Sequence, residues 1–199
     1  CSDGGFLGAL CGLMIDAYLF KLENCHVIGG VINYQGSATK ACVGGLVGEI
    51  VNEESRDGCD FSGLGCSADA SVTCASTISG EAGAAGIGGL IGLSANVSPL
   101  TIKGSFFHGS VYTPSTSHVG LVYGLSDFTP TVTSVYYQST MTGTNYVTTE
   151  SNANATKVDG TTTTWSTAVT NMNDAISNDI TGYQYVLKEG ASCPVMEKK

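Results

Sequence analysis

Four glycine-flanked apolar segments recur along the chain, and this recurrence constrains the fold more than any other feature. They are Gly4–Gly8, Gly44–Gly48, Gly88–Gly92 and Gly120–Gly124, and their starts lie 40, 44 and 32 residues apart. A strand this short cannot bury its apolar face alone, but stacked equivalent strands make a parallel sheet with a continuous core. The recurrence predicts an all-β fold, an irregular parallel β-helix or β-solenoid of about four repeats. The alternative, a glycine-rich β-sandwich, leaves the recurrence unexplained.

A second segment follows the first in each repeat and predicts a further strand of small and large residues. Residues 25–31 align with residues 105–111, so that His26 and His108 lie two positions apart in the alignment. Weaker matches begin at Cys59 and at Ser134. We therefore expect a repeat domain over residues 1–140, with a Cys-rich insertion at about residues 59–86.

The G-G-L-[VI]-G strand, followed by a strand of small and aromatic residues, resembles the GLUG-motif repeat. The resemblance covers about residues 4–140, with Phe6 in place of Leu and Leu121 in place of the second Gly. GLUG repeats occur in surface proteins, adhesins and some secreted peptidases of bacteria and protists. The resemblance implies a β-solenoid surface module and says little about activity.

The C-terminal part of the chain has a different pattern. Residues 141–164 are rich in Thr and Asn and predict a loop. Helical spacing follows, with Thr164 as the expected N-cap of a short helix, and then an alternating strand. The helix carries Trp165, Ala168, Val169, Met172 and Ile176, and the strand carries Tyr183, Tyr185 and Leu187. We expect residues 165–199 to form a cap and tail, because the end of a repeat stack exposes backbone and core.

The charge balance excludes some partners. The net charge is −9, from 8 basic and 17 acidic residues. No basic patch is available to neutralise phosphates, so nucleic acid is not an expected partner. No apolar run is long enough to span a bilayer, so membrane insertion is not expected either.

The eight cysteines point to an oxidising compartment. An even count suggests disulfides, and the spacings are too wide for the C-x(2–4)-C pairs of a zinc knuckle. The predicted disulfide-forming residues are Cys1, Cys11, Cys25, Cys42, Cys59, Cys66, Cys74 and Cys193. Cys25 and Cys59 hold equivalent positions in the repeat alignment and are the predicted pair. The start at Cys1 favours a processed N-terminus over the alternative of a lipidated cysteine.

Two N-glycosylation sequons, at Asn96 and Asn154, agree with an extracellular or cell-surface location. They support that location without establishing it, since chance sequons are common in Ser- and Thr-rich chains.

The sequence predicts no catalytic, cofactor-binding or metal-binding residues, and hence not an enzyme. The three histidines, His26, His108 and His118, form no close pair and no H-E-x-x-H motif. Cys25 and His26 are adjacent, but neighbours along a strand point to opposite faces, so they do not form a nucleophile–base pair. The acidic residues are scattered rather than paired.

These patterns predict an extracellular structural or adhesive protein. It is expected to assemble with itself into filaments or a surface layer, because the N-terminal end of the stack has little to cover it. The alternatives are a glycan-binding, lectin-like module, a binder of host or matrix surfaces, and a carbohydrate-active enzyme on a β-helix. The lectin alternative depends on outward-facing aromatic residues in the last two repeats: Phe106, Phe107, Tyr112, Tyr123, Tyr136 and Tyr137.

Overall fold

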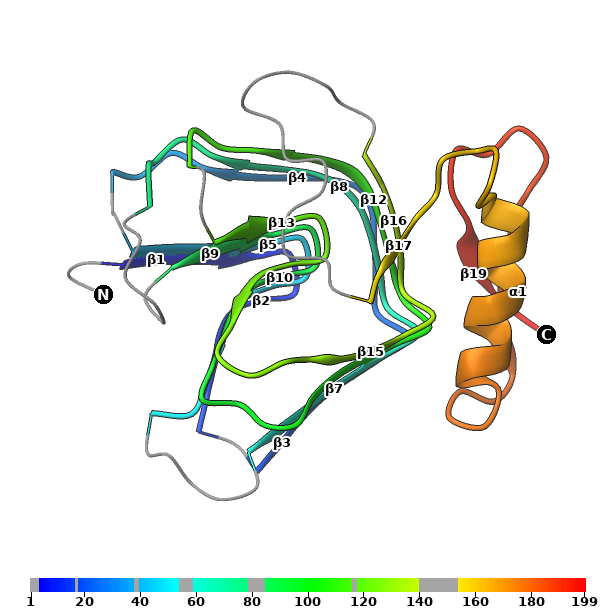
Figure 1. Ribbon diagram of the computed structural model, residues 1–199, viewed down its shortest axis with the longest axis horizontal. Helices are drawn as coiled ribbons and strands as arrows, with labels where there is room; N and C mark the ends of the chain where they lie inside the picture. Colours follow the sequence, from blue (N-terminus) through cyan, green and yellow to red (C-terminus); the bar gives the residue numbers. More distant parts are fainter. Residues whose placement is uncertain are drawn as a thin grey trace.

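The computed structural model describes residues 4–16, 18–37, 40–53, 59–78, 85–115, 118–139 and 154–199. Parallel strands dominate these residues and one short helix follows them, which confirms the predicted all-β class (Figure 1). Four consecutive strands make one repeat: β1–β4, β5–β8, β9–β12 and β13–β16. Each strand pairs in parallel with its counterpart in the next repeat.

The strands form four sheets, here named A to D, with one strand from every repeat in each sheet. Sheet A holds β1 (Gly4–Gly8), β5 (Lys40–Gly44), β9 (Gly86–Gly88) and β13 (Val119–Gly120). Sheet B holds β2 (Cys11–Ile15), β6 (Val47–Val51), β10 (Ile91–Ala95) and β14 (Tyr123–Ser126). Sheet C holds β3 (Leu19–Glu23), β7 (Asp60–Leu64), β11 (Leu100–Lys103) and β15 (Thr131–Thr133). Sheet D holds β4 (His26–Tyr34), β8 (Ser67–Cys74), β12 (Phe106–Tyr112) and β16 (Tyr136–Ser139), with β17 (Thr156–Lys157) as a fifth strand.

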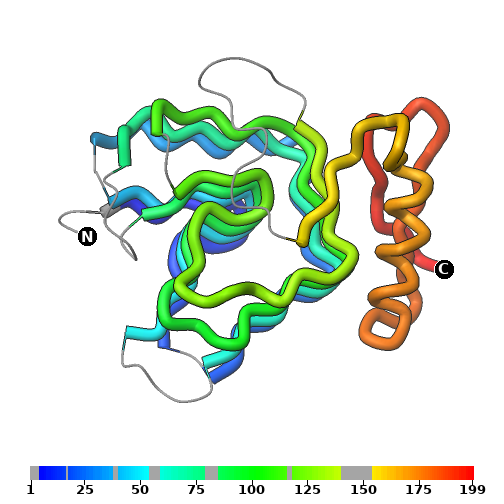
Figure 2. Tube along the Cα trace, viewed as in Figure 1, coloured from blue at the N-terminus to red at the C-terminus, as the bar shows by residue number. Residues whose placement is uncertain are grey.

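Sheet A lies inside the molecule, between sheets D and B, and the repeats superimpose along the viewing direction (Figure 2). Small and β-branched side chains of sheet A, such as Ala41 and Val43, pack in the main core with Ala68 and Val72 of sheet D. A second apolar cluster, which includes Cys42 and Leu93, lies between sheets A and B. Two faces of sheet A are therefore buried.

The recurring glycine motif forms the corner between sheets A and B rather than a strand. Gly8, Gly44, Gly88 and Gly120 end the strands of sheet A and stack in register, at spacings of 36, 44 and 32 residues. The first copy of the motif is therefore residues 8–12, and the sequence-based choice of residues 4–8 is wrong by four residues. Those residues belong to β1, the strand before the corner.

Steric contact explains why the corner needs glycine. The chain reverses over two residues, and sheets A and B come together backbone to backbone. A Cβ atom on Gly88 would overlap the Ile91 carbonyl oxygen and lie 2.8 Å from the Gly124 nitrogen. Since both are backbone atoms held by the stack, they cannot move aside easily.

The corner between sheets C and D is equally regular. Two residues separate the strands in every repeat, and the first of them has a positive φ: Asn24, Gly65, Gly104 and Ser134, with φ of 52°, 58°, 54° and 50°. Asn and Gly tolerate this left-handed conformation better than most residues. The same turn geometry thus repeats four times.

The second sequence pattern is partly correct. His26, Ser67, Phe106 and Tyr136 are in register in sheet D, as the alignment of residues 25–28 with residues 105–108 predicts. A bulge after Ile28 then shifts the register by one residue. The segment at Cys59 leads into β7 of sheet C, and Ser67–Cys74 is the second-repeat strand of sheet D. The predicted insertion at residues 59–86 is wrong for this part, which forms ordinary repeat strands.

The C-terminal segment contains the predicted helix and strand. Of the predicted loop at residues 141–164, residues 154–164 are described, and β17 lies within them. Helix α1 spans Trp165–Ile176, and the Thr164 side chain accepts a hydrogen bond from the Thr167 N–H, as expected for an N-cap. Strands β18 (Tyr183–Val186) and β19 (Val195–Lys198) then form an antiparallel hairpin.

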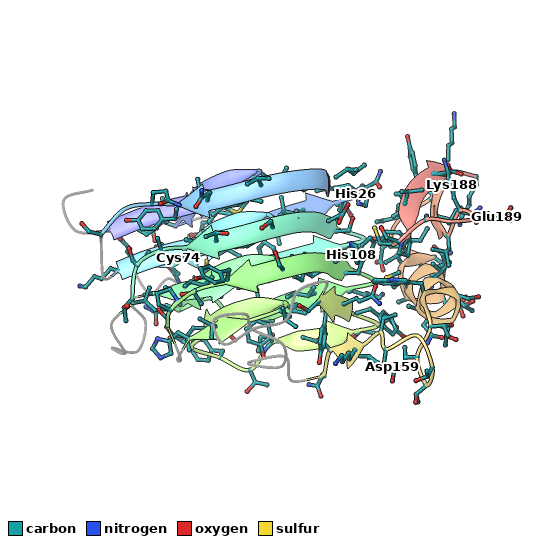
Figure 3. All side chains as sticks on the ribbon, turned by 90° about the horizontal axis from the view of Figure 1, so that it is seen from above. His26, Cys74, His108, Asp159, Lys188 and Glu189 are labelled. Atoms are coloured by element: carbon teal, nitrogen blue, oxygen red, sulfur yellow. The ribbon has the colours of Figure 1, made fainter. Side chains whose placement is uncertain are left out.

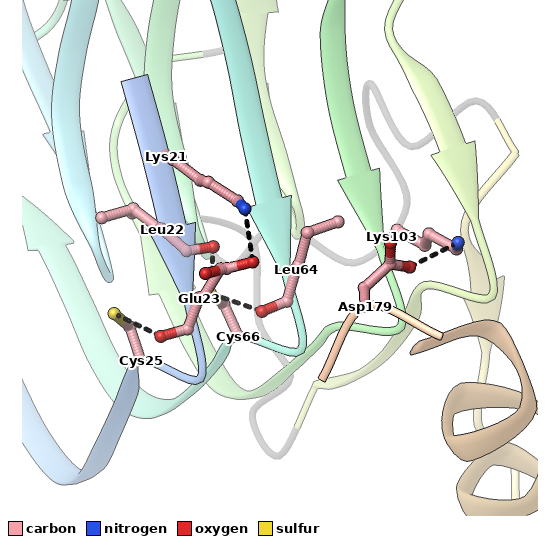
Figure 4. Close-up of polar contacts among 8 residues, drawn as sticks. All are labelled: Lys21, Leu22, Glu23, Cys25, Leu64, Cys66, Lys103 and Asp179. Carbon is pink, nitrogen blue, oxygen red and sulfur yellow. Dashed lines mark hydrogen bonds and ion pairs between the residues drawn. The ribbon is translucent and has the colours of Figure 1, made fainter. Parts of the chain in front are cut away.

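This segment lies along the side of the stack and not over its end, which corrects the predicted cap. Figure 1 shows α1 and β19 outside the C–D corner, viewed down the shortest axis of the molecule. The Trp165 Nε1–H donates to Gln138 of the fourth repeat, and the Tyr185 ring meets His26 of the first repeat at 6.0 Å. Lys103 of the third repeat forms an ion pair with Asp179 at 2.7 Å (Figure 4). Helix α1 and the β18–β19 hairpin, residues 165–198, therefore hold the repeats together from the side and are here called the lateral clamp.

Candidate functional site

The outer face of sheet D brings together three side chains that sequence analysis did not connect. Asp69 of β8 and His108 of β12 are register neighbours in adjacent repeats. Cys193 reaches them from the loop before β19. Since the inward positions of these strands are filled by Ala68 and Phe107, strand alternation directs Asp69 and His108 outward, towards the clamp.

The geometry of this cluster is compact. The His108 Nδ1 lies 2.7 Å from the Asp69 Oδ1, and one donor atom from each of the three residues lies within 4.8 Å of the others. The His108 side chain is 8% exposed and Cys193 is 9% exposed. The Trp165 ring packs at 6.3 Å from the His108 ring, so the clamp covers the cluster. Figure 3 shows His108 at the side of the stack that faces the C-terminal segment.

The electrostatics of Cys193 argue against nucleophilic catalysis. Burial, and then the negative charge of Asp69, raises the pKa of the Cys193 thiol to about 11. A Cys–His–Asp arrangement catalyses acyl transfer through a thiolate, and this thiol stays protonated at neutral pH. The same donors, sulfur, imidazole nitrogen and carboxylate oxygen, are the ligands that zinc-class metal ions prefer.

A small cavity adjoins the cluster. It has a volume of about 70 Å³ and lies between sheet D and the hairpin, with Asp69, Ser67, Phe106, Cys193 and Met196 in its lining. Pockets for drug-sized molecules have about 300–1,000 Å³. The cavity therefore suits an ion and its water better than a sugar or a peptide.

His26 lines the same cavity but has a structural role. Its Nδ1 contacts the Ser67 hydroxyl at 2.8 Å and its Nε2 contacts the Asn24 side-chain oxygen at 2.8 Å. Burial lowers the pKa of His26 to about 4, so the ring is neutral at physiological pH. With both nitrogens engaged, His26 holds the first C–D corner. His118, the third histidine, lies just before β13 with a φ of 58°.

The aromatic residues proposed as a glycan-stacking surface are mostly buried. Phe106 and Tyr136 lie under the clamp, and Phe107 and Tyr137 lie in the main core. Tyr123 is also buried, while Tyr112 is half-buried. The lectin alternative required some of these six side chains to be exposed, and five of them are buried, which leaves it without the surface that it needs.

The seven cysteines in the described residues, Cys11, Cys25, Cys42, Cys59, Cys66, Cys74 and Cys193, are free thiols in the structure. Cys1 lies outside the described residues. The predicted equivalence of Cys25 and Cys59 is wrong, because Cys59 precedes β7 whereas Cys25 follows β3. Cys66 occupies the position of Cys25 in the next repeat, each lying one residue before the register neighbours His26 and Ser67. The Cys25 thiol donates to the Glu23 carbonyl oxygen at 3.3 Å, and the Cys66 thiol donates to the carbonyl oxygens of Leu22 and Leu64 at 3.4 Å each (Figure 4). The disulfide framework itself stays a prediction.

The two predicted glycosylation sites are accessible. Asn96 and Asn154 are exposed, and both have a positive φ, 54° and 68°. The exposure agrees with glycosylation but does not test it. Among the described residues, no helix has the length and apolar character needed to cross a membrane.

Comparison with family models, with curated proteins and with solved structures gave no match in any of the three. The resemblance to GLUG repeats therefore stays an inference from the motif.

Sequence reasoning missed the Asp69–His108–Cys193 cluster because its members are far apart in the chain. Asp69 and His108 could have been paired by a correct repeat alignment, since they occupy the same position of consecutive repeats. The alignment placed the second repeat at Cys59 instead of Cys66 and so hid the pair. No sequence signal places Cys193 beside them, because its position depends on how the clamp packs.

Proposed function

We propose that the chain is an irregular β-solenoid module of an extracellular structural or adhesive protein, and that it associates with itself through the ends of its stack. The observation that carries this proposal is the incomplete burial of the first repeat. Leu7, Met14 and Phe20 are half-buried, whereas their register partners in the second repeat, Val43, Ile50 and Phe61, are at most 2% exposed. The core of the first repeat is therefore open to a further layer, which a second copy would supply under this proposal.

The edges of the sheets supply the matching polar contacts. Strands β1–β4 are the edge strands at one end of sheets A to D, and β13, β14, β15 and β17 are those at the other. All pairings within these sheets are parallel, so the last repeat of one copy can extend the first repeat of another, head to tail. Heterologous contacts of this kind produce filaments when the rotation between copies does not close a ring.

Large apolar side chains are exposed on the first repeat, and their burial against another molecule would be favourable. Ile28 and Val31 of β4 are each 76% exposed and Leu19 of β3 is 56% exposed. A shallow groove of about 440 Å³ runs between β1 and β4 and is lined by residues such as Leu7, Val31 and Ile32. Exposed apolar surface on an edge strand commonly marks an interaction site.

The alternatives have less support. Glycan stacking depended on aromatic residues that are buried, and the small cavity at Cys193 does not suit a sugar chain. We also propose a location outside the cell, which the cysteine content, the exposed sequons and the resemblance to GLUG surface proteins support.

The test is concentration-dependent association, measured by light scattering on purified protein and by electron microscopy. We expect oligomers or filaments of the unmodified chain, and expect the double variant Leu19→Lys/Val31→Lys to remain monomeric because charges on an edge strand oppose pairing. Tyr183→Lys, at a 41% exposed site on the lateral hairpin, is the control and should still associate. Monomers alone at every concentration would contradict the proposal.

A further inference from the structure

The Asp69–His108–Cys193 cluster has the donor set of a mononuclear metal site. We propose that it binds one divalent metal ion of the zinc class on the outer face of sheet D. Carboxylate, imidazole and thiolate are all common zinc ligands, and zinc held by three protein ligands completes its coordination with a water molecule. The three donor atoms lie within 4.8 Å of one another. Ligand atoms around tetrahedral zinc lie about 3.3–3.8 Å apart. The His108 Nδ1 and the Asp69 Oδ1, 2.7 Å apart in a hydrogen bond, would therefore separate slightly if both bound the ion, and Cys193 would adjust its distance to them.

Rigid elements hold two of the three ligands. Asp69 and His108 sit opposite each other on paired strands, each fixed by the backbone ladder of sheet D. The Trp165 ring packs beside the His108 ring and the main core lies beneath both strands. Cys193 lies on the loop between β18 and β19, which can supply the small movement that coordination needs.

The chemistry of the cavity complements a cation. Without a metal ion, burial beside a carboxylate disfavours the thiolate form of Cys193. A bound dication favours the thiolate instead, and coordination releases the thiol proton to solvent. The cavity of about 70 Å³ next to Cys193 leaves room for a water molecule at the fourth position. His26 borders the cavity, but both of its ring nitrogens already have partners.

Metal at this site would join the lateral clamp to the second and third repeats. The ion would connect the loop before β19 to β8 and β12, which are already paired with each other in sheet D. A metal ion that binds only the folded state raises the free energy of unfolding by RT ln(1 + c/Kd), where c is the free metal concentration, so the gain grows with metal concentration. The site would thus be structural and independent of whether the stack ends associate.

The experiment is metal binding by the reduced, metal-free chain. We expect one equivalent of Co²⁺ to bind with a near-ultraviolet thiolate-to-cobalt absorption band, and Zn²⁺ to displace it and raise the melting temperature. Cys193→Ser should abolish the band, and Asp69→Asn should weaken affinity at least about tenfold. Cys59→Ser, which removes a buried thiol outside the cluster, should leave binding unchanged.

A second measurement needs no variant. Zn²⁺ should protect Cys193 from alkylation in the unmodified chain, as read by peptide mass spectrometry. Absence of binding, a cobalt band that persists in Cys193→Ser, or alkylation of Cys193 that Zn²⁺ does not change would each overturn the proposal.

Discussion

At the scale of single residues, Cys25 and Cys66 form the best-placed thiol pair. They precede register neighbours on β4 and β8, where adjacent strands lie about 4.7–4.9 Å apart, within the range of Cα separations that a disulfide spans. We predict that mild oxidation links them and raises the free energy of unfolding by about 2–4 kcal/mol. Peptide mapping identifies the linked pair, and reduction reverses the gain.

The control for this prediction is Cys59→Ser, which should leave the cross-link intact. Recovery of Cys25 linked to Cys59, or to any cysteine other than Cys66, would contradict the prediction that strand register sets the disulfide pairing.

Glu49 is a buried carboxyl group at the same scale. It lies on β6 between sheets A and B and is 8% exposed. Burial raises its pKa, with Glu53 adding to the shift, although a hydrogen bond with Cys42 opposes it. A raised pKa in the folded state means that stability is fully present below the pKa of the unfolded chain, about 4.3, and is lost as pH rises through the folded value.

We therefore predict that Glu49→Gln is more stable than the unmodified chain at pH 7 and that the two converge near pH 4. Chemical denaturation at both pH values measures this. Glu189→Gln, at an exposed site in the loop before Cys193, is the control and should show no such pH dependence. An equal effect of Glu49→Gln at both pH values would contradict the electrostatic cause.

At the scale of elements, the corner between sheets C and D decides where α1 packs. A Cβ on Gly104 would overlap the Ile176 side chain, and one on Gly65 would lie 2.5 Å from Ile180 Cδ1. The first and fourth corners carry Asn24 and Ser134 instead. Glycine at the two middle corners therefore serves both the positive φ and the close approach of the clamp.

The substitution Gly104→Asn tests these two roles separately. Asn still tolerates the left-handed conformation, but its side chain prevents the close approach of the clamp. We predict a loss of about 1–3 kcal/mol from overpacking against Ile176. Hydrogen exchange should show that, relative to the unmodified chain, the amide protection of α1 falls more than that of the sheets. Ser134→Asn, at the fourth corner, is the matched control and should cost little, because Asn tolerates the same positive φ. A loss of the same size there would contradict overpacking against Ile176 as the cause.

At the scale of the whole molecule, the clamp ties repeats together that otherwise contact only their neighbours. Trp165 is 8% exposed, packs at 5.2 Å from Phe106 and bonds to Gln138, so it joins the third and fourth repeats. We predict that Trp165→Ala lowers the free energy of unfolding by about 3–5 kcal/mol, as for other large buried aromatics. Phe128→Ala, at a 48% exposed site, is the control and should change the free energy of unfolding little. Equal free energies of unfolding for the two variants would mean that the clamp does not stabilise the stack.

The sequence predicted the elements better than it predicted their arrangement. Periodicity identified the helix with its Thr164 cap and the parallel stacking, because both depend on local residue patterns. It misplaced the first glycine corner, since Gly4 and Gly8 are both followed by a small residue and a similar apolar run. The lateral position of the clamp and its contact with His108 arise from tertiary packing, which no local pattern encodes.

The connections between strands differ in how much their lengths vary from repeat to repeat. Two residues join sheets A and B, and two join sheets C and D, in all four repeats. The linkers from B to C hold 3, 8, 4 and 4 residues, and those from D to A hold 5, 11 and 6. The A–B and C–D connections therefore have one fixed length, whereas the B–C and D–A connections vary in length. The two longest linkers, between Val51 and Asp60 and between Cys74 and Gly86, are therefore the places where an inserted peptide should alter the strand pairing least. Asn52, Cys59, Ile78 and Ala85 within them are buried and should be kept.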